Sequence, residues 1–224
     1  MTNHDRWSKL TTESTNPRSR SLDTMSAVAI SRLIAAEDAR AVRAVSSAAG
    51  VIARVAGVFA RCIAGGGRVI YIGAGTSGRL GVIDAAELVP TFGLPRRGPG
   101  SAIGIIAGGP KALRESVEGA EDDARRGRDA IKRLGLSGKD LVIGISASSL
   151  APFVRAALMS AKKDGAATVL VTMNKIAKPA FVDFLIAARV GAEVLAGSTR
   201  MKAGLATKSI LHNISTTAMV LADK

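Results

Sequence analysis

The chain has 224 residues, enough for one ordinary domain with a short appendage. Hydrophobic residues make up 47% and aromatic residues 3%, so a core must be built mainly from Ala, Val, Ile and Leu. No apolar run reaches the ~18 residues that a membrane-spanning helix requires, and the polar N-terminus lacks the apolar centre of a signal peptide. The single cysteine, Cys62, rules out an internal disulfide framework and favours a reducing compartment. We therefore expect a cytoplasmic protein without a membrane partner.

The net charge is +13, from 31 Lys and Arg against 18 Asp and Glu. A basic chain of this kind could bind nucleic acid. The basic residues are scattered, however, and most fall beside Asp and Glu at helical spacings. There is no helix-turn-helix pattern, zinc-ligand spacing or set of stacking aromatics. We expect a solvated basic surface that attracts anionic small molecules, and no nucleic-acid partner.

Along the chain, residues 1–22 are predicted to form an N-terminal arm, and residues 23–224 a single domain. Two helices open that domain, one ending near Asp38 and one covering roughly 41–64. Alternating elements follow: strands 68–72, 102–106, 141–145, 167–172 and 184–188, and helices 79–89, 110–133, 151–163 and 203–221. Strands that alternate with helices predict an α/β fold, a doubly wound parallel sheet of about five strands flanked by helices.

The turn Gly73-Ala-Gly-Thr-Ser-Gly78 joins the first strand to a helix. Backbone N–H groups at such a turn point toward one place and suit a phosphate, and the hydroxyls of Thr76 and Ser77 can add donors. The glycines also fit the dinucleotide pattern G-x-G-x-x-G. A dinucleotide site would need an acid at the end of the next strand, and that strand runs into Ala107-Gly-Gly109. The sequence favours a phosphosugar loop over a dinucleotide site or a plain tight turn.

Acidic residues supply candidate proton-transfer groups. Glu118 and Glu121 are three apart within a predicted helix and would share one face. Clustered carboxylates raise one another's pKa toward the range useful near neutral pH. Spacing alone favours a solvated acidic face, and Glu87 taken alone is also best explained as a surface acid.

Three segments together resemble the N-acetylmuramic acid 6-phosphate etherases: GAGTSGRLGVIDAAELVPTFG, IAGGPKALRESVEGAEDDA and VGAEVLAGSTRMKAG. This family belongs to the sugar isomerase (SIS) superfamily of phosphosugar-binding domains. The likeness runs from about Leu10 to the C-terminus, and the family's chains usually continue with a further helical portion beyond the position of Lys224. The resemblance implies an SIS-type domain, a homodimer, and a phosphorylated amino sugar as substrate.

The resemblance also implies the reaction and its residues. D-lactate is lost from C3 of the open-chain sugar phosphate, and water then adds to give N-acetylglucosamine 6-phosphate. No metal or other cofactor is needed. Glu87, in DAAE, matches the family's acid/base glutamate, and Glu121, in EGAE, matches its other catalytic carboxylate. The candidate substrate-binding residues are Gly75, Thr76, Ser77, Gly78, Arg79, Glu118, Ser146, Ser148, Ser198 and Lys202.

One loop departs from the family's A-S-G-R-T-P pattern. Ser149, Leu150 and Ala151 stand where the family has glycine, arginine and threonine. Serine does not readily replace a glycine at positive φ, and each lost hydrogen bond to a charged phosphate is worth roughly 1.5–3 kcal/mol. The altered loop favours an alternative function, a phosphosugar-binding regulatory module without turnover. The intact Glu87 and Glu121 favour the enzyme.

Overall fold

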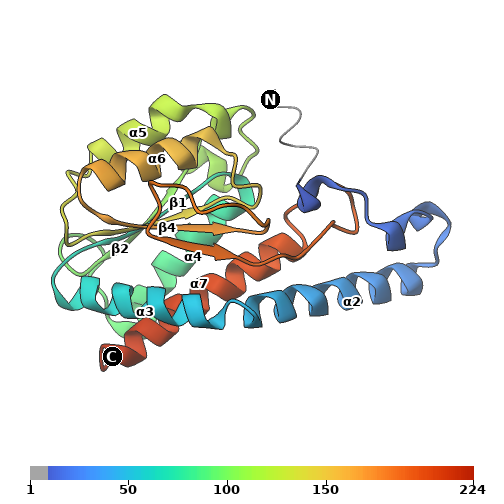
Figure 1. Cartoon of the computed structure of the whole chain (residues 1–224), viewed down its shortest axis with the longest axis horizontal. Helices are drawn as coiled ribbons and strands as arrows, with labels where there is room; N and C mark the ends of the chain where they lie inside the picture. The colour runs from blue at the N-terminus through green and yellow to red at the C-terminus, as the bar shows by residue number, and fades with distance from the viewer. Residues whose placement is uncertain (1–9) are drawn as a thin grey trace.

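The computed structural model describes residues 10–224, and its centre is a five-stranded, all-parallel sheet (Figure 1). The strands are β1 (Val69–Gly73), β2 (Ala102–Ile106), β3 (Leu141–Ile145), β4 (Ala167–Thr172) and β5 (Phe184–Ala187). Their order is β2-β1-β3-β4-β5, and Val69 of β1 pairs with Ala102 of β2 on one side and Leu141 of β3 on the other. The predicted doubly wound fold is confirmed. The first nine residues of the predicted arm lie outside the described residues.

Helices cover both faces of the sheet. They are α2 (Ala27–Ser46), α3 (Ala49–Ala64), α4 (Gly75–Phe92), α5 (Ala124–Lys132), α6 (Pro152–Lys163) and α7 (Lys202–Leu221). Helices α3, α4 and α7 pack on one face, and α5 and α6 pack on the other (Figure 1). Helix α2 packs on α7 and extends beyond the edge of the sheet, with the arm returning from its far end toward the sheet.

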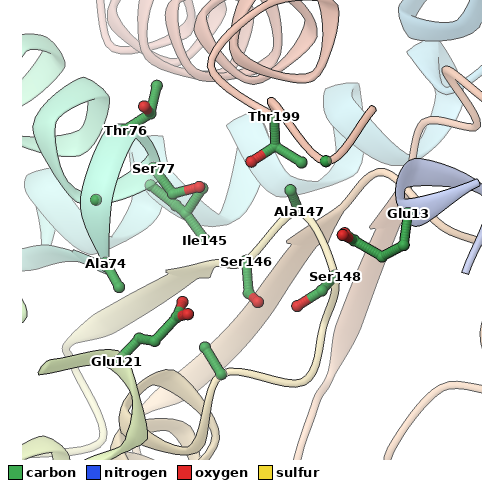
Figure 2. Close-up of a pocket in the computed structure, with 13 residues that line it drawn as sticks. Glu13, Ala74, Thr76, Ser77, Glu121, Ile145, Ser146, Ala147, Ser148 and Thr199 are labelled. Carbon is green, nitrogen blue, oxygen red and sulfur yellow. The ribbon is translucent and has the colours of Figure 1, made fainter. Parts of the chain in front are cut away.

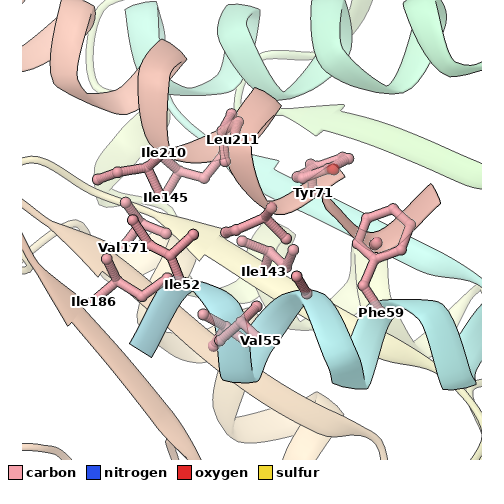
Figure 3. Packing of buried hydrophobic residues seen from close by; sticks show 14 of the residues in the cluster. Ile52, Val55, Phe59, Tyr71, Ile143, Ile145, Val171, Ile186, Ile210 and Leu211 are labelled. Atoms are coloured by element: carbon pink, nitrogen blue, oxygen red, sulfur yellow. The ribbon is translucent and has the colours of Figure 1, made fainter. Parts of the chain in front are cut away.

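Side chains that alternate along the strands fill two separate hydrophobic cores, one on each face of the sheet. Tyr71 of β1 faces the layer of α3 and α7, whereas its neighbours Ile70 and Ile72 face α6. Side chains of a strand point alternately to opposite faces, and a parallel sheet covered on both faces needs apolar residues at every position. Figure 3 shows the first of these cores, in which Phe59 of α3 packs against the Tyr71 ring at a centroid distance of 6.5 Å.

A close approach of backbone to backbone joins β1 to α4. A Cβ atom added to Gly73 would lie 2.7 Å from the backbone nitrogen of Gly78, and one added to Gly78 would lie 2.7 Å from the carbonyl oxygen of Gly73. Only glycine fits either position. The two glycines therefore let α4 begin directly at the end of β1, at Gly75 rather than at residue 79 as predicted.

The predicted helix over residues 110–133 is wrong. The segment forms two short 3₁₀ turns, η4 (Gly109–Leu113) and η5 (Ala120–Asp122), before α5 begins. Gly119 takes a left-handed conformation with φ of 69°, and the Asp123 carboxylate caps α5 by accepting a hydrogen bond from the backbone N–H of Arg126. A left-handed residue and a new N-cap both interrupt a helix. Glu118 and Glu121 consequently do not share a helical face.

No single helix among residues 10–224 is long and apolar enough to cross a membrane. Helices α2 and α3 would pass that test as a pair by length and composition alone, but they meet at a bend of 62°. Within the same residues, no three His, Cys, Asp or Glu side chains are grouped so that they could hold a metal ion.

Candidate functional site

The largest concentration of predicted site residues surrounds a cavity of about 290 Å³ at the carboxyl ends of β1 and β3. The chain leaves these two neighbouring strands toward opposite faces of the sheet, and ligands of open α/β sheets bind at such a point. The cavity is lined by Glu13, Ala74, Gly75, Thr76, Ser77, Glu121, Ile145, Ser146, Ala147, Ser148, Ala151, Gly197 and Thr199 (Figure 2). Among these described residues there are two carboxylates and no Lys or Arg.

One wall is the start of α4. Because the helix begins at Gly75, Thr76 and Ser77 lie in its first turn, and both line the cavity. The first N–H groups of a helix have no partner within the helix, and the helix dipole favours an anion there. Thr199, from the loop before α7, adds a third hydroxyl. This wall is suited to a phosphate group.

The loop after β3 forms the floor and brings Ser146 and Ser148 to the cavity (Figure 2). It is tied to β4, since the carbonyl oxygen of Ala147 accepts hydrogen bonds from Thr172 Oγ1 at 3.0 Å and Asn174 Nδ2 at 2.9 Å. Ser149 is buried and has a φ of 69°, so a serine does occupy a position that favours glycine. The loop places two serine hydroxyls at the cavity.

Glu121 reaches the cavity from η5 and remains accessible to solvent. Its pKa is raised, first by partial burial and then by the negative charges of Asp122, Glu13 and Glu118. A carboxylate with a raised pKa is the stronger base. Glu118 contributes to this pKa through its charge, although it does not line this cavity; its carboxylate accepts a hydrogen bond from Ser116 Oγ at 2.9 Å.

Glu13 was missed by the sequence prediction. It points into the cavity from the side opposite Glu121, with Ser146 and Ser148 between them (Figure 2). The arm is held there by Asn174, whose Oδ1 accepts from Thr11 Oγ1 at 3.0 Å and whose Nδ2 donates to Thr12 Oγ1 at 3.0 Å. The only signal in the sequence was that the segment LTTESTNPRSRSLD resembles the N-terminal arm of the etherase family.

A second cavity, of about 230 Å³, lies beside the first and shares Ala74, Gly75 and Glu121 with it. Arg79 of α4 lines it, together with the segment from Glu115 to Glu121. The guanidinium is held by two backbone carbonyls, with Nε donating to Leu113 O at 3.2 Å and Nη2 to Glu115 O at 2.9 Å. Glu121 therefore stands between two cavities, one lined by hydroxyls and one holding a cation.

Four predicted site residues line neither cavity. Gly78 is buried against Gly73, where β1 meets α4. Glu87 is exposed on α4, about 16 Å along the helix axis from Thr76, and does not line either cavity within one chain. Ser198 is half-buried but is not a lining residue, although its neighbours Gly197 and Thr199 are. Lys202 is buried and its ammonium donates to Glu37 Oε2, so its charge serves the packing of α7 on α2.

A family model matches residues 50–162: the N-terminal SIS domain of glucokinase regulatory protein. A Jannaschia sp. protein named N-acetylmuramic acid 6-phosphate etherase is 45% identical over 216 residues, covering 96% of this chain and 67% of the relative. A protein of the same name from Gloeobacter violaceus is 48% identical over 218 residues, with 96% and 70% covered. The chain belongs to the N-acetylmuramic acid 6-phosphate etherase family. The predicted resemblance is confirmed.

Solved structures of other proteins share the fold of this chain. The protein c3406 from Escherichia coli CFT073, solved in complex with a ligand, has a TM-score of 0.61 at 20% identity, covering 89% of this chain and 94% of that one. The phosphoheptose isomerase GmhA from Neisseria gonorrhoeae has a TM-score of 0.55 at 15% identity, with 87% and 100% covered. At these identities the likeness shows the SIS-type fold alone.

Proposed function

We propose that this protein is a lyase that cleaves the D-lactyl ether of N-acetylmuramic acid 6-phosphate, giving N-acetylglucosamine 6-phosphate and D-lactate. The observation that carries the proposal is Glu121, a carboxylate with a raised pKa that stands in a hydroxyl-lined cavity at the start of α4. Family membership at 45–48% identity over almost the whole chain supplies the substrate. The reaction belongs to amino sugar catabolism, in which cell-wall fragments are recycled.

The phosphate is assigned to the first turn of α4, with Thr76, Ser77 and Ser146 as its neutral donors. The open-chain sugar then extends across the cavity toward Glu121. The aldehyde at C1 acidifies the C2 proton, so Glu121 in its ionised form can remove it. The electron pair forms the C2–C3 double bond as the lactyl oxygen leaves C3 with a proton. Water then adds at C3, and a proton returns to C2.

A second carboxyl group is needed to give a proton to the lactyl oxygen and to take one from the incoming water. The family resemblance assigns an acid/base role to Glu87, which stays a prediction because Glu87 does not reach the cavity within one chain. Glu13 lines the cavity and is a further candidate. Neither role requires a metal ion or a redox cofactor.

The second candidate function is a phosphosugar-binding module without turnover. No Lys or Arg is among the described residues that line the first cavity, and Leu150 stands where the family resemblance predicts arginine. The matching family model comes from a regulatory protein. A module of this kind would bind sugar phosphates and release no lactate.

For the whole protein we propose a cytoplasmic homodimer with no nucleic-acid or membrane partner. Apolar side chains exposed on α2 and at the end of α7 support association; they include Val28, Val42, Val220 and Leu221. Light scattering would test it, with twice the chain mass of 23.0 kDa expected.

The decisive experiment is incubation with N-acetylmuramic acid 6-phosphate and an enzymatic assay for D-lactate. Release of one lactate per N-acetylglucosamine 6-phosphate formed would support the lyase. In parallel, N-acetylglucosamine 6-phosphate should raise the melting temperature, whereas unphosphorylated N-acetylglucosamine should not. Stabilisation without lactate release would favour the regulatory module, and equal effects of both sugars would contradict the phosphate assignment.

A further inference from the structure

The second cavity is lined by one cation, Arg79, and by the carboxylate residues Glu115, Glu118 and Glu121. Arg79 forms no ion pair within 4.0 Å with a carboxylate of residues 10–224, although Glu115 and Glu118 line the same cavity. Glu115 is paired with Lys111 at 3.3 Å, and Glu118 accepts from Ser116. The two carbonyls that hold Arg79 use two of its five N–H groups and fix its position without neutralising its charge. Such a guanidinium is suited to an anionic ligand.

The position of this cation relative to the first cavity limits which anion it can serve. Both cavities share Ala74, Gly75 and Glu121, so a ligand can extend from one to the other past the Glu121 carboxylate. The substrate of the proposed function has two anionic groups, the 6-phosphate and the lactyl carboxylate, at opposite ends of the bond-breaking region. With the phosphate at the hydroxyl-lined wall, a substrate that extends past Glu121 would bring its lactyl group to the second cavity.

We propose that the second cavity is the leaving-group subsite, in which Arg79 binds the carboxylate of the D-lactyl ether. The inference rests on the proposed function and deepens it, because it fixes the direction in which the substrate lies. It places the C2–C3 region beside Glu121. It also explains why the site should bind a 3-O-carboxyalkyl sugar more tightly than a sugar with a free C3 hydroxyl. The fork of N–H donors on arginine matches the geometry of a carboxylate.

The test compares two ligands that differ in the carboxylate-bearing lactyl group alone. The Michaelis constant for N-acetylmuramic acid 6-phosphate and the inhibition constant of N-acetylglucosamine 6-phosphate are measured for the wild type and for Arg79→Gln. We expect Arg79→Gln to raise the Michaelis constant for N-acetylmuramic acid 6-phosphate by about 10-fold or more, because a charge-assisted contact is lost. The inhibition constant of N-acetylglucosamine 6-phosphate should stay within about twofold of the wild-type value. Unchanged binding of the second ligand also shows that the cavity has kept its fold.

Two further variants sharpen the result. Arg79→Lys keeps the charge without the fork and should weaken N-acetylmuramic acid 6-phosphate by less than Arg79→Gln does. Arg114→Gln removes a nearby exposed arginine that lines neither cavity, and should change neither constant. Equal weakening of both ligands by Arg79→Gln would make Arg79 a phosphate ligand and overturn the inference, as would no change in either.

Failure of the proposed function would look different. A wild-type protein that binds sugar phosphates but releases no lactate would contradict the lyase and allow both ligands to be titrated directly by calorimetry. The wild type should then bind the muramic acid phosphate more tightly than the glucosamine phosphate, and Arg79→Gln should abolish that difference. Equal affinities in the wild type would overturn the leaving-group subsite.

Discussion

The carboxylate of Glu121 is the group on which the proposed chemistry depends. Glu121→Gln keeps the shape but cannot accept a proton, so lactate release should fall by about 10²-fold or more while ligand binding changes little. Asp129→Asn, on α5 and outside both cavities, is the matched control and should retain wild-type turnover. The family resemblance predicts a similar loss for Glu87→Gln. Wild-type turnover in both variants would show that neither Glu121 nor Glu87 takes part in proton transfer, and it would contradict the mechanism.

Glu13 acts on Glu121 through its charge. The raised pKa of Glu121 arises from partial burial and from Asp122, Glu13 and Glu118. Activity that requires ionised Glu121 should increase as pH rises through that pKa, above the ordinary value of 4.5. Glu13→Gln removes one negative charge, which stabilises the ionised form and should move this acidic limb of kcat/KM to lower pH. The measurement is kcat/KM of both proteins from about pH 4 to about pH 8. An acidic limb at the same pH in both would exclude an effect of the Glu13 charge on Glu121.

Among the connecting elements, the loop after β3 carries Ser149, Leu150 and Ala151, where the family resemblance predicts glycine, arginine and threonine. Ser149 has a φ of 69°, a conformation that costs a non-glycine residue roughly 1–2 kcal/mol. The triple variant Ser149→Gly, Leu150→Arg and Ala151→Thr should relieve this strain and restore a cation and a hydroxyl. We expect kcat/KM to rise at least about 10-fold, since one charged contact is worth that much.

The three changes adjoin one another, so they should be tested together rather than summed from single variants. No gain over a parent that already turns over well would mean that this loop does not bind the phosphosugar. Ligand binding without turnover in both proteins would support the regulatory module.

A buried ion pair fastens α7 to α2. Glu37 and Lys202 are each 2% exposed, and the same carboxylate accepts hydrogen bonds from Arg18 and Arg40. Burial alone would raise the pKa of Glu37, but the hydrogen bond and charge of Lys202, with Arg40 and Arg18, outweigh it and lower the pKa. Glu37→Gln leaves an uncompensated buried ammonium and should lower the free energy of unfolding by about 3–5 kcal/mol in urea titrations. The double variant Glu37→Gln, Lys202→Met should recover part of the loss; no recovery would mean that the pair is not the cause.

For the whole molecule, Asp140 ties the beginnings of β1 and β3 together. Its carboxylate accepts from the backbone N–H of Arg68 at 2.7 Å, from Arg68 Nη2 at 2.9 Å and from the backbone N–H of Ser137 at 2.8 Å. Burial opposes ionisation, but these bonds lower the pKa of Asp140 below its ordinary 3.8. The stabilisation is therefore complete above that ordinary pKa and is lost as pH falls through the lowered value.

Asp140→Asn should accordingly destabilise the protein by about 3 kcal/mol at neutral pH. The difference between variant and wild type should shrink as the pH falls below the pKa of the folded state, because the wild-type carboxyl is then protonated as well. Urea titrations at neutral and at strongly acidic pH measure both quantities. A difference that is independent of pH would show that shape, not charge, accounts for the loss.

The sequence by itself determined the order of strands and helices along the chain. It also identified one wall of the site, the turn from β1 into α4. Continuous apolar strands identify a covered parallel sheet, because burial on both faces demands it. Gly73, Gly75 and Gly78 mark the strand-to-helix turn, since a Cβ at Gly73 or Gly78 would clash. The family resemblance predicted Glu121, Ser146 and Ser148 as site residues, and all three line the cavity.

Only the tertiary structure decided which distant residues share that cavity. Glu13 is more than a hundred residues from Glu121 and is brought opposite it by hydrogen bonds through Asn174. Periodicity could not foresee the break at Gly119, because a left-handed residue there competes with helical propensity and packing selects between them. Lys202 is a second case, because the family resemblance made it a candidate substrate-binding residue. Burial beside Glu37 makes it a structural cation instead, because a buried charge must be paired.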